Sequence, residues 1–206
     1  MARSSEPPSK GESDSPKVHR TAVVSERARI GARTRIWHFC HVMGGARIGS
    51  DCSFGQNCHV AAKVVIGDRV RVQNNVSLFD GVQIGDDVFL GPSCVFTNVI
   101  NPRATVSRKR ELRATVVERG ATVGANATIV CGVTLGAHCF IGAGAVVSRD
   151  VRPYSLVIGV PGKHVGWVSR YGEKLTFDGS GLATCPATGE LYREFPDGVR
   201  PMPAAS

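Results

Sequence analysis

The sequence predicts an all-β fold, a left-handed parallel β-helix. A large apolar residue occupies every sixth position from Val24 to Phe96, and the same rhythm returns from Val117 to Val147. Neither the 3.6-residue period of a helix nor the alternation of an ordinary strand produces this spacing. Four residues after each large residue stands a small or β-branched one, so each six-residue side turns two side chains inward. Three such sides close a narrow triangular coil of about 18 residues.

Four glycines mark one corner of the predicted triangle. Gly31, Gly49, Gly67 and Gly85 each follow a large apolar residue and are spaced 18 apart. Because glycine adopts positive φ without steric cost, we expect the backbone to have positive φ at these positions.

The rhythm also sets the boundaries. The polar, proline-rich residues 1–17 are expected to be a disordered tail. Residues 18–151 form the β-helix domain, interrupted by an extruded loop at 99–116, and residues 152–206 form a C-terminal extension. Within that extension, the segments "KLTFDG" and "ELYREF" predict a short hairpin.

Composition limits the kind of partner. The chain has 206 residues, 42% of them hydrophobic, and a formal net charge of +8. It lacks both an apolar run of the ~20 residues that cross a bilayer and a signal-peptide-like apolar segment, so we expect a cytoplasmic protein that does not bind a membrane. The positive charge favours an anionic partner. Few aromatic residues and no helical basic stripe disfavour nucleic acid, but net charge alone does not identify the anion, and a phosphorylated small molecule is one candidate.

The cysteines fit the small inward position of the coil. Free thiols behave there as small hydrophobic groups, and this applies to Cys40, Cys52, Cys58, Cys94 and Cys139. Cys40 and Cys58 stack one coil apart, as do His41 and His59, but inward thiols and outward imidazoles cannot chelate one metal ion. No metal is expected. A zinc-dependent β-helical carbonic anhydrase and a non-catalytic scaffold that binds nucleic acid remain as alternatives.

The extruded loop is the natural candidate for function, because a β-helix has no internal pocket. The loop is basic, with Arg103, Arg108, Lys109, Arg110 and Arg113. An anion-binding cleft completed by a neighbouring subunit is expected here, with a merely solvated loop as the alternative.

Two long motifs then resemble a known family. The hexapeptide rhythm, the loop, "VGANATIVCGVTLGAHCFIGAGAVVSRDV" and "VIGVPGKHVG" resemble the left-handed β-helix acyltransferases that use acyl-coenzyme A. The segment "VQNNVSLFDGVQIGDDVFLGPSCVFTNVINPR" resembles the bacterial UDP-2-acetamido-3-amino-2,3-dideoxyglucuronate 3-N-acetyltransferases of surface polysaccharide biosynthesis. Enzymes that acetylate dTDP-3-amino-3,6-dideoxyhexoses share much of this block, and serine or maltose acetylation is a further competitor.

The resemblance implies a homotrimer with acetyl-CoA lying between neighbouring β-helices. Lys163 in "GVPGKHVG" matches a basic residue near the adenosine phosphates of the coenzyme, and Arg149 is expected to assist it. The small residues Ala127, Ala143 and Ala145 would let the pantetheine arm approach the backbone, although the coil itself also requires small residues.

The same resemblance implies how the reaction is catalysed. Matching "FTNV" to the family places on Asn98 the role of holding the sugar amine, while the departing coenzyme thiolate takes the proton. Asp80, 18 residues before Asn98, should stack beside it and is the alternative general base. Asn101-Pro102 stands where serine and sugar acetylases generally carry a catalytic histidine, so no histidine base is expected.

The substrate-binding residues are expected around this pair. Gln73, Asn74 and Asn75 offer amides to the sugar, with a structural asparagine ladder as the alternative. His38 and His59 are candidates for contact with the nucleotide. In the loop, Asn101 and Arg103 are candidates for the sugar, and Arg103 is the first choice to hold a uronate carboxylate.

Overall fold

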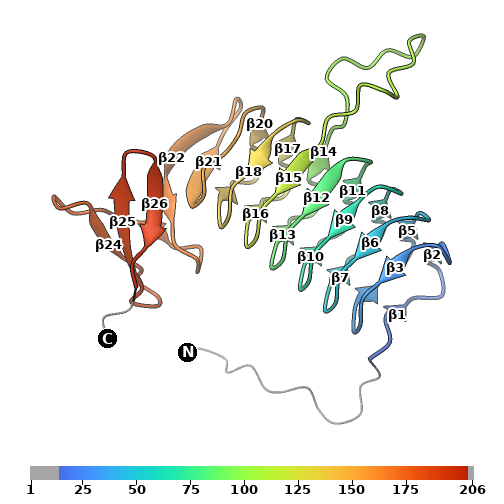
Figure 1. The fold of residues 1–206 in the computed structure, drawn as a ribbon, viewed down its shortest axis with the longest axis horizontal. Helices are drawn as coiled ribbons and strands as arrows, with labels where there is room; N and C mark the ends of the chain where they lie inside the picture. The colour runs from blue at the N-terminus through green and yellow to red at the C-terminus, as the bar shows by residue number, and fades with distance from the viewer. Residues whose placement is uncertain (1–13, 204–206) are drawn as a thin grey trace.

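The protein is a parallel β-helix in which three sheets wind around one core. The computed structural model describes residues 14–203, so most of the predicted 1–17 tail lies outside the described residues. Figure 1 shows the coils stacked side by side, with a long loop leaving the stack after β14 and a small sheet beyond its last coil. The predicted parallel β-helix is confirmed, while its left-handed sense stays a prediction.

Each of the three sheets is formed by the strands on one side of successive coils. The first sheet contains, in spatial order, β1 (Lys17–Val18), β4 (Arg35–Ile36), β7 (Ser53–Phe54), β10 (Arg71–Val72), β13 (Phe89–Leu90), β16 (Thr122–Val123), β19 (Phe140–Ile141), β21 (Ser155–Ile158), β22 (Lys163–Val168) and β23 (Lys174–Leu175). The second contains β2 (Val23–Val24), β5 (His41–Val42), β8 (His59–Val60), β11 (Ser77–Leu78), β14 (Val95–Phe96), β17 (Thr128–Ile129) and β20 (Val146–Val147). The third contains β3 (Arg29–Ile30), β6 (Arg47–Ile48), β9 (Val65–Ile66), β12 (Val82–Ile84), β15 (Thr115–Val117) and β18 (Thr134–Leu135).

The core consists of the residues that the six-residue rhythm turns inward. From Ile36 to Val147 the large apolar positions are buried, and the five cysteines assigned to the small position are buried free thiols. Thr34 is also buried, and its hydroxyl donates a hydrogen bond to the Gly49 carbonyl at 2.8 Å. Val24 and Ile30, in the first coil, are only partly buried because no coil covers them from outside.

The expectation of positive φ at the four spaced glycines is wrong. None of Gly31, Gly49, Gly67 and Gly85 has positive φ, and the left-handed residues stand two positions later, at Arg33, Asp51, Arg69 and Asp87. The glycines are needed for close stacking instead. A Cβ on Gly49 would lie 2.4 Å from the Gly67 carbonyl oxygen of the next coil.

Two predicted boundaries shift. The loop spans residues 97–114, because Thr115 and Val116 already belong to β15 and pair with Val82 and Gln83 of β12. At the N-terminal end, Lys17 belongs to β1 and pairs with Arg35, so the β-helix begins before residue 18. In both places backbone pairing with the next coil extends the regular structure.

The C-terminal extension does not leave the β-helix at residue 152. Strand β21 pairs in parallel with β19, and its Val157 is buried at the end of the core. The chain then folds back as β22, antiparallel to β21. The first sheet therefore gains one more parallel rung before the rhythm ends.

The predicted hairpin between "KLTFDG" and "ELYREF" is wrong as well. Strand β23 pairs with β22, whereas β25 (Leu191–Phe195) pairs with β24 (Leu182–Thr184) and β26 (Gly198–Pro201). Lys174–Leu175 takes the free edge of β22 instead of pairing with the later segment. A second small core covers this end, formed by Tyr154, Trp167, Leu175, Ala183, Cys185, Tyr192 and Val199.

Candidate active site

One corner of the triangle carries the two candidate catalytic residues and the extruded loop. This corner follows the strands of the second sheet, and we call it the loop edge. It consists of residues 25–28, 43–46, 61–64, 79–81, 97–114, 130–133 and 148–150. Because each coil repeats the last, residues at equivalent places on this edge stack in a line along the molecule.

Asp80 and Asn98 lie on this edge in neighbouring coils. Strands β11 and β14 pair with Ser77 opposite Val95, which keeps the 18-residue offset that relates Asp80 to Asn98. Asp80 uses its Oδ1 to accept a hydrogen bond from the backbone nitrogen of Lys63, at 2.9 Å. The same carboxylate thus helps to hold the preceding coil in place.

Asn98 lies at the neck of the loop. Its carbonyl accepts a hydrogen bond from the backbone nitrogen of Arg113 at 3.0 Å, which joins the two ends of the loop. The side chain is partly buried, and it has no hydrogen-bond partner among residues 14–203. Its amide is therefore available to a ligand at the edge of a rigid scaffold.

His59 stands next to Asp80 on the outer face of the second sheet. Its ring centroid lies 5.2 Å from that of His41 and 5.9 Å from that of Phe79. Desolvation, together with the neighbouring His41, lowers the pKa of His59, whereas the Asp80 carboxylate acts in the opposite direction. An imidazole that is neutral at neutral pH can accept a proton. His59 is therefore a second candidate general base, next to Asp80.

The predicted amide residues lie at a different corner. Gln73, Asn74 and Asn75 follow β10, so the second sheet separates them from the loop edge. Asn74 Oδ1 accepts a hydrogen bond from the backbone nitrogen of Gln56 at 3.0 Å, and Asn75 Oδ1 accepts one from Asn57 Nδ2 at 3.1 Å. These contacts join successive coils, which is the arrangement of a structural asparagine ladder.

His38 shares that second corner, two coils nearer the N-terminus. Its ring centroid lies 3.7 Å from that of His19 and 6.2 Å from that of Trp37, which is exposed. The rings form an aromatic surface over which a flat base could stack.

Asn101 and Arg103 lie on the extruded loop. Both are exposed, and Figure 1 shows the loop extending away from the coils. Within the loop, Arg103 pairs with Val106, and Arg108 forms an ion pair with Glu111 at 2.7 Å. Within one chain the structure does not bring Asn101 and Arg103 to Asp80 or His59.

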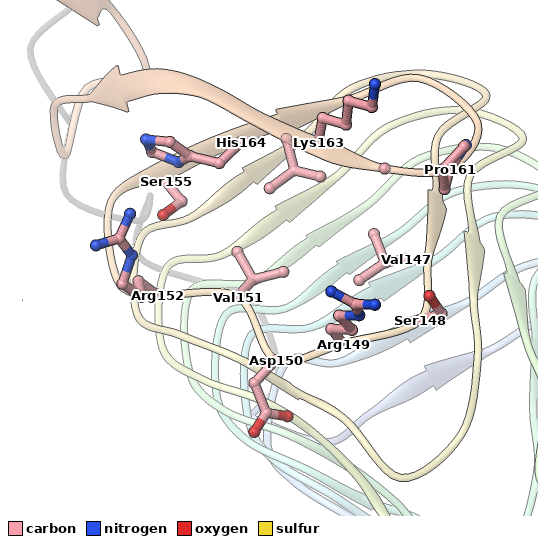
Figure 2. Close-up of a pocket in the computed structure, with 12 residues that line it drawn as sticks. Val147, Ser148, Arg149, Asp150, Val151, Arg152, Ser155, Pro161, Lys163 and His164 are labelled. Atoms are coloured by element: carbon pink, nitrogen blue, oxygen red, sulfur yellow. The ribbon is translucent and has the colours of Figure 1, made fainter.

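Arg149 and Lys163 lie at the C-terminal end of the β-helix. They line a pocket of about 370 Å³ with Arg152, His164 and Asp150. Arg149 reaches into the opening, whereas the Lys163 side chain points outward from β22 (Figure 2). Three basic side chains around one opening favour binding of a phosphorylated group.

The three candidate alanines separate into two kinds. Ala127 and Ala145 are fully buried in the core, so their methyl groups cannot face a ligand. Ala143 is exposed at the corner that follows β19. The coil itself therefore requires the first two to be small, and only Ala143 offers an open surface to the pantetheine arm.

Comparison with known proteins identifies the family. The model of the bacterial transferase hexapeptide (six repeats) matches residues 27–62, 45–80 and 114–149. The dTDP-3-amino-3,6-dideoxy-alpha-D-galactopyranose 3-N-acetyltransferase of Aneurinibacillus thermoaerophilus is 40% identical over 183 residues, which cover 88% of this chain and 92% of that protein. The chain belongs to the hexapeptide-repeat transferases. It is an acyltransferase of this family, as the resemblance of its motifs implied.

Other similarities of the transferase are more limited in extent. The bifunctional protein GlmU of Thermotoga maritima is 35% identical over 85 residues, which are 39% of the transferase and 19% of that protein. A solved structure of a GDP-perosamine N-acetyl transferase variant from Caulobacter crescentus, in complex with CoA and GDP-perosamine, is 27% identical. The match covers 73% of the transferase and 56% of that chain, with a TM-score of 0.49.

Two structural findings concern the alternatives considered from sequence. Within residues 14–203, no group of three or more His, Cys, Asp or Glu side chains is arranged to hold a metal ion. The buried Cys40 and Cys58 and the outward-facing His41 and His59 have the opposed orientations expected from the coil. Over the same residues, the transferase contains no helix long and apolar enough to cross a membrane.

Sequence reasoning missed two features of the transferase. The first is the contact of Phe79 with the His59 ring, whereas the stacking of His41 and His59 was predicted from their 18-residue spacing and is confirmed. Arg152 joins the C-terminal pocket, with its guanidinium 4.7 Å from the centroid of the Trp167 ring. No sequence signal pointed to Arg152, because Trp167 reaches it only after β22 folds back.

Proposed function

We propose that the transferase moves the acetyl group of acetyl-CoA to the 3-amino group of a nucleotide-linked sugar, a dTDP-3-amino-3,6-dideoxyhexose. The observation that carries this proposal is the 40% identity to a dTDP-3-amino-3,6-dideoxy-galactose 3-N-acetyltransferase, spread over nearly the whole of both chains. It favours the dTDP-linked sugar over UDP-2-acetamido-3-amino-2,3-dideoxyglucuronate, which the sequence motifs had put first.

Acetyl-CoA is the proposed co-substrate, and no metal is required. The coenzyme is a polyanion, and the pocket with Arg149, Arg152 and Lys163 offers it cationic groups at the C-terminal end of the loop edge. Further along that edge, towards the N-terminus, lie Asn98 and Asp80. A coenzyme with its phosphates at the pocket and its arm along the edge would bring the thioester towards these residues.

In the proposed reaction the sugar amine attacks the thioester carbonyl, the C–S bond breaks, and the amine proton passes to the departing thiolate. Asn98 would orient the amine, since asparagine cannot itself take the proton. His59 and Asp80 are the groups of this chain that could take the proton in place of the thiolate.

The proposed assembly is a homotrimer. The loop exposes Ile100, Val106 and Leu112, three apolar side chains with no coil of their own chain to cover them. A neighbouring subunit would cover them and would receive Asn101 and Arg103 at its own edge. The buried free thiols fit the reducing cytoplasm, where we place the enzyme. We propose that it acts on small molecules and not on nucleic acid or membranes.

A panel of nucleotide-linked amino sugars tests this function. Purified enzyme would be incubated with acetyl-CoA and with dTDP-linked 3-amino-3,6-dideoxyhexoses, the UDP-linked 3-amino uronate, or a 4-amino sugar, and release of the CoA thiol would be measured. Turnover of the dTDP-linked 3-amino sugars at kcat/KM values at least about 10-fold above the others is expected. Preference for the uronate would return the assignment to the UDP-linked substrate, and turnover of none would refute sugar acetylation.

A further inference from the structure

Four basic side chains gather where the third sheet adjoins the N-terminal end of the loop edge. Arg27, Arg29, Arg47 and Lys63 line a pocket of about 460 Å³ that no carboxylate borders. Within residues 14–203, none of the four has an acidic partner within salt-bridge distance. We call these four residues the basic cluster.

The strand register places like charges of the basic cluster opposite each other, which lowers the stability of the protein when no anion is bound. Arg29 and Arg47 are directly paired on β3 and β6, about 4.8 Å apart along the sheet. Like charges in directly opposed positions destabilise a sheet. At a neighbouring corner the same chain alternates the sign of its charges. Arg33 forms a bidentate ion pair with Asp51, and Arg69 forms a bidentate ion pair with Asp87.

A bound anion would remove that cost. The guanidinium groups of two stacked arginines and a nearby lysine provide several donors to phosphate oxygens, and charge-assisted bonds of this kind are strong. The basic cluster lies next to Asp80, because the backbone nitrogen of Lys63 donates a hydrogen bond to Asp80 Oδ1 at 2.9 Å. An anion held at Lys63 would lie one coil from Asp80 and two coils from Asn98.

The position along the edge decides which anion fits. The pocket around Arg149 lies at the opposite end of the loop edge, four to six coils away, or about 19–29 Å at one strand spacing per coil. The candidate catalytic residues lie between these two basic sites. Two separate anion sites, one towards each end of the loop edge, suit a reaction with two phosphorylated substrates.

We propose that the basic cluster binds the diphosphate of the sugar nucleotide, while the Arg149 pocket serves the coenzyme. This inference rests on the proposed function for the identity of the ligand. It assigns the acceptor substrate to the N-terminal coils, with its diphosphate on the third sheet and its sugar directed to the loop edge.

The test uses dTDP as the probe, because dTDP carries the diphosphate and needs neither the sugar nor acetyl-CoA. Binding to the full-length enzyme would be measured by calorimetry for wild type and for Arg29→Gln, Arg47→Gln and their combination. Each single variant should weaken dTDP binding about 10- to 100-fold, as expected when a charge-assisted bond to phosphate is lost. Inorganic pyrophosphate should compete with dTDP for wild type.

Arg193→Gln is the control. Arg193 is an exposed basic residue on β25, in the small C-terminal sheet. It should leave dTDP affinity within about twofold. Melting temperatures within a few degrees of wild type for all variants would show that the coils are intact.

Steady-state kinetics separate this inference from the proposed function. Acetylation of the sugar by wild type would support the proposed function. A higher KM for the sugar nucleotide in the double variant, with an unchanged KM for acetyl-CoA, would support the assignment of the basic cluster. Unchanged dTDP affinity in the double variant, or an increased acetyl-CoA KM alone, would overturn the assignment of the cluster even if wild type acetylates the sugar. Loss of dTDP binding in the variants of an enzyme that acetylates no sugar would support the diphosphate site and refute the function.

Discussion

Three side chains on three successive coils, His59, Asp80 and Asn98, are the candidates for catalysis, and mutation can separate their roles. Asn98→Ala should lower the single-turnover rate by about 10- to 1000-fold, because the amine loses an orienting partner beside the thioester. Asp80→Asn keeps an oxygen that can accept the Lys63 hydrogen bond, so the coil should survive and the rate should fall little. His59→Gln should act mainly on the KM of the sugar nucleotide.

The measurement is rapid-mixing kinetics with acetyl-CoA and the best sugar from the panel, between pH 6 and 9. If Asp80→Asn or His59→Gln abolished the chemical step while Asn98→Ala left it nearly intact, the altered residue would be the general base. The thiolate would then not be the proton acceptor.

His138 makes the stability of the fold sensitive to acid. Its ring stacks on Tyr154 with centroids 5.2 Å apart. Desolvation, followed by the nearby Arg170 and Arg119, lowers the pKa of His138 below 6.5. The unfolded chain therefore takes up a proton more readily than the folded chain as the pH falls through about 6.5, and folded stability declines below that pH.

His138→Asn should remove part of this pH dependence. Asparagine tolerates the left-handed backbone that His138 adopts at φ 57°, so the corner should be retained. Melting temperatures measured from pH 7.5 to 5.5 should fall less steeply for the variant than for wild type. Parallel curves for the two proteins would show that His138 does not contribute.

At the scale of the coil, the spaced glycines set how closely neighbouring turns can approach. Gly49→Ala should destabilise the protein by about 2–4 kcal/mol, because its Cβ would collide with the Gly67 backbone, which cannot move aside as the Asp68 side chain could. Denaturant unfolding measures this change.

Gly179→Ala is the control for Gly49→Ala. A Cβ at Gly179 meets no atom within 4 Å, and the residue does not have positive φ. The substitution should change stability by less than about 0.5 kcal/mol. Equal effects of the two substitutions would mean that the coils can move apart to admit a methyl group.

At the scale of the whole molecule, the proposed trimer predicts that the loop is needed for activity. Replacing residues 99–112 with Gly-Ser-Gly should leave the coils folded, with a melting temperature within about 5 °C of wild type, since the neck is already joined by the Arg113–Asn98 hydrogen bond. Acetylation should be lost, because Asn101 and Arg103 are removed from the neighbouring site.

Light scattering would accompany the activity assay. Wild type is expected to have the mass of a trimer, and the shortened chain to dissociate more readily. An active wild-type monomer, or a fully active chain without the loop, would show that each site is complete within one subunit.

The sequence by itself determined the β-helix, the inward side chains and the place of the loop. The coil repeats locally, so a residue such as Phe54 or Leu78 is buried for the same reason in each turn, and the six-residue rhythm is visible without knowledge of distant contacts. The 18-residue offset likewise predicted that Asp80 and Asn98 would lie on neighbouring coils.

The tertiary structure decided which outward residues share an edge and what they contact. Asn74 and Asp80 are close in sequence but lie at different corners, whereas Arg29 and Lys63 are distant in sequence and line one pocket. The role of Gly49 also depended on the backbone of the next coil, and the place of Arg152 on the return of β22. A periodic sequence specifies the inside of a coil because each turn repeats the same burial, but its surface follows from stacking that joins residues many positions apart.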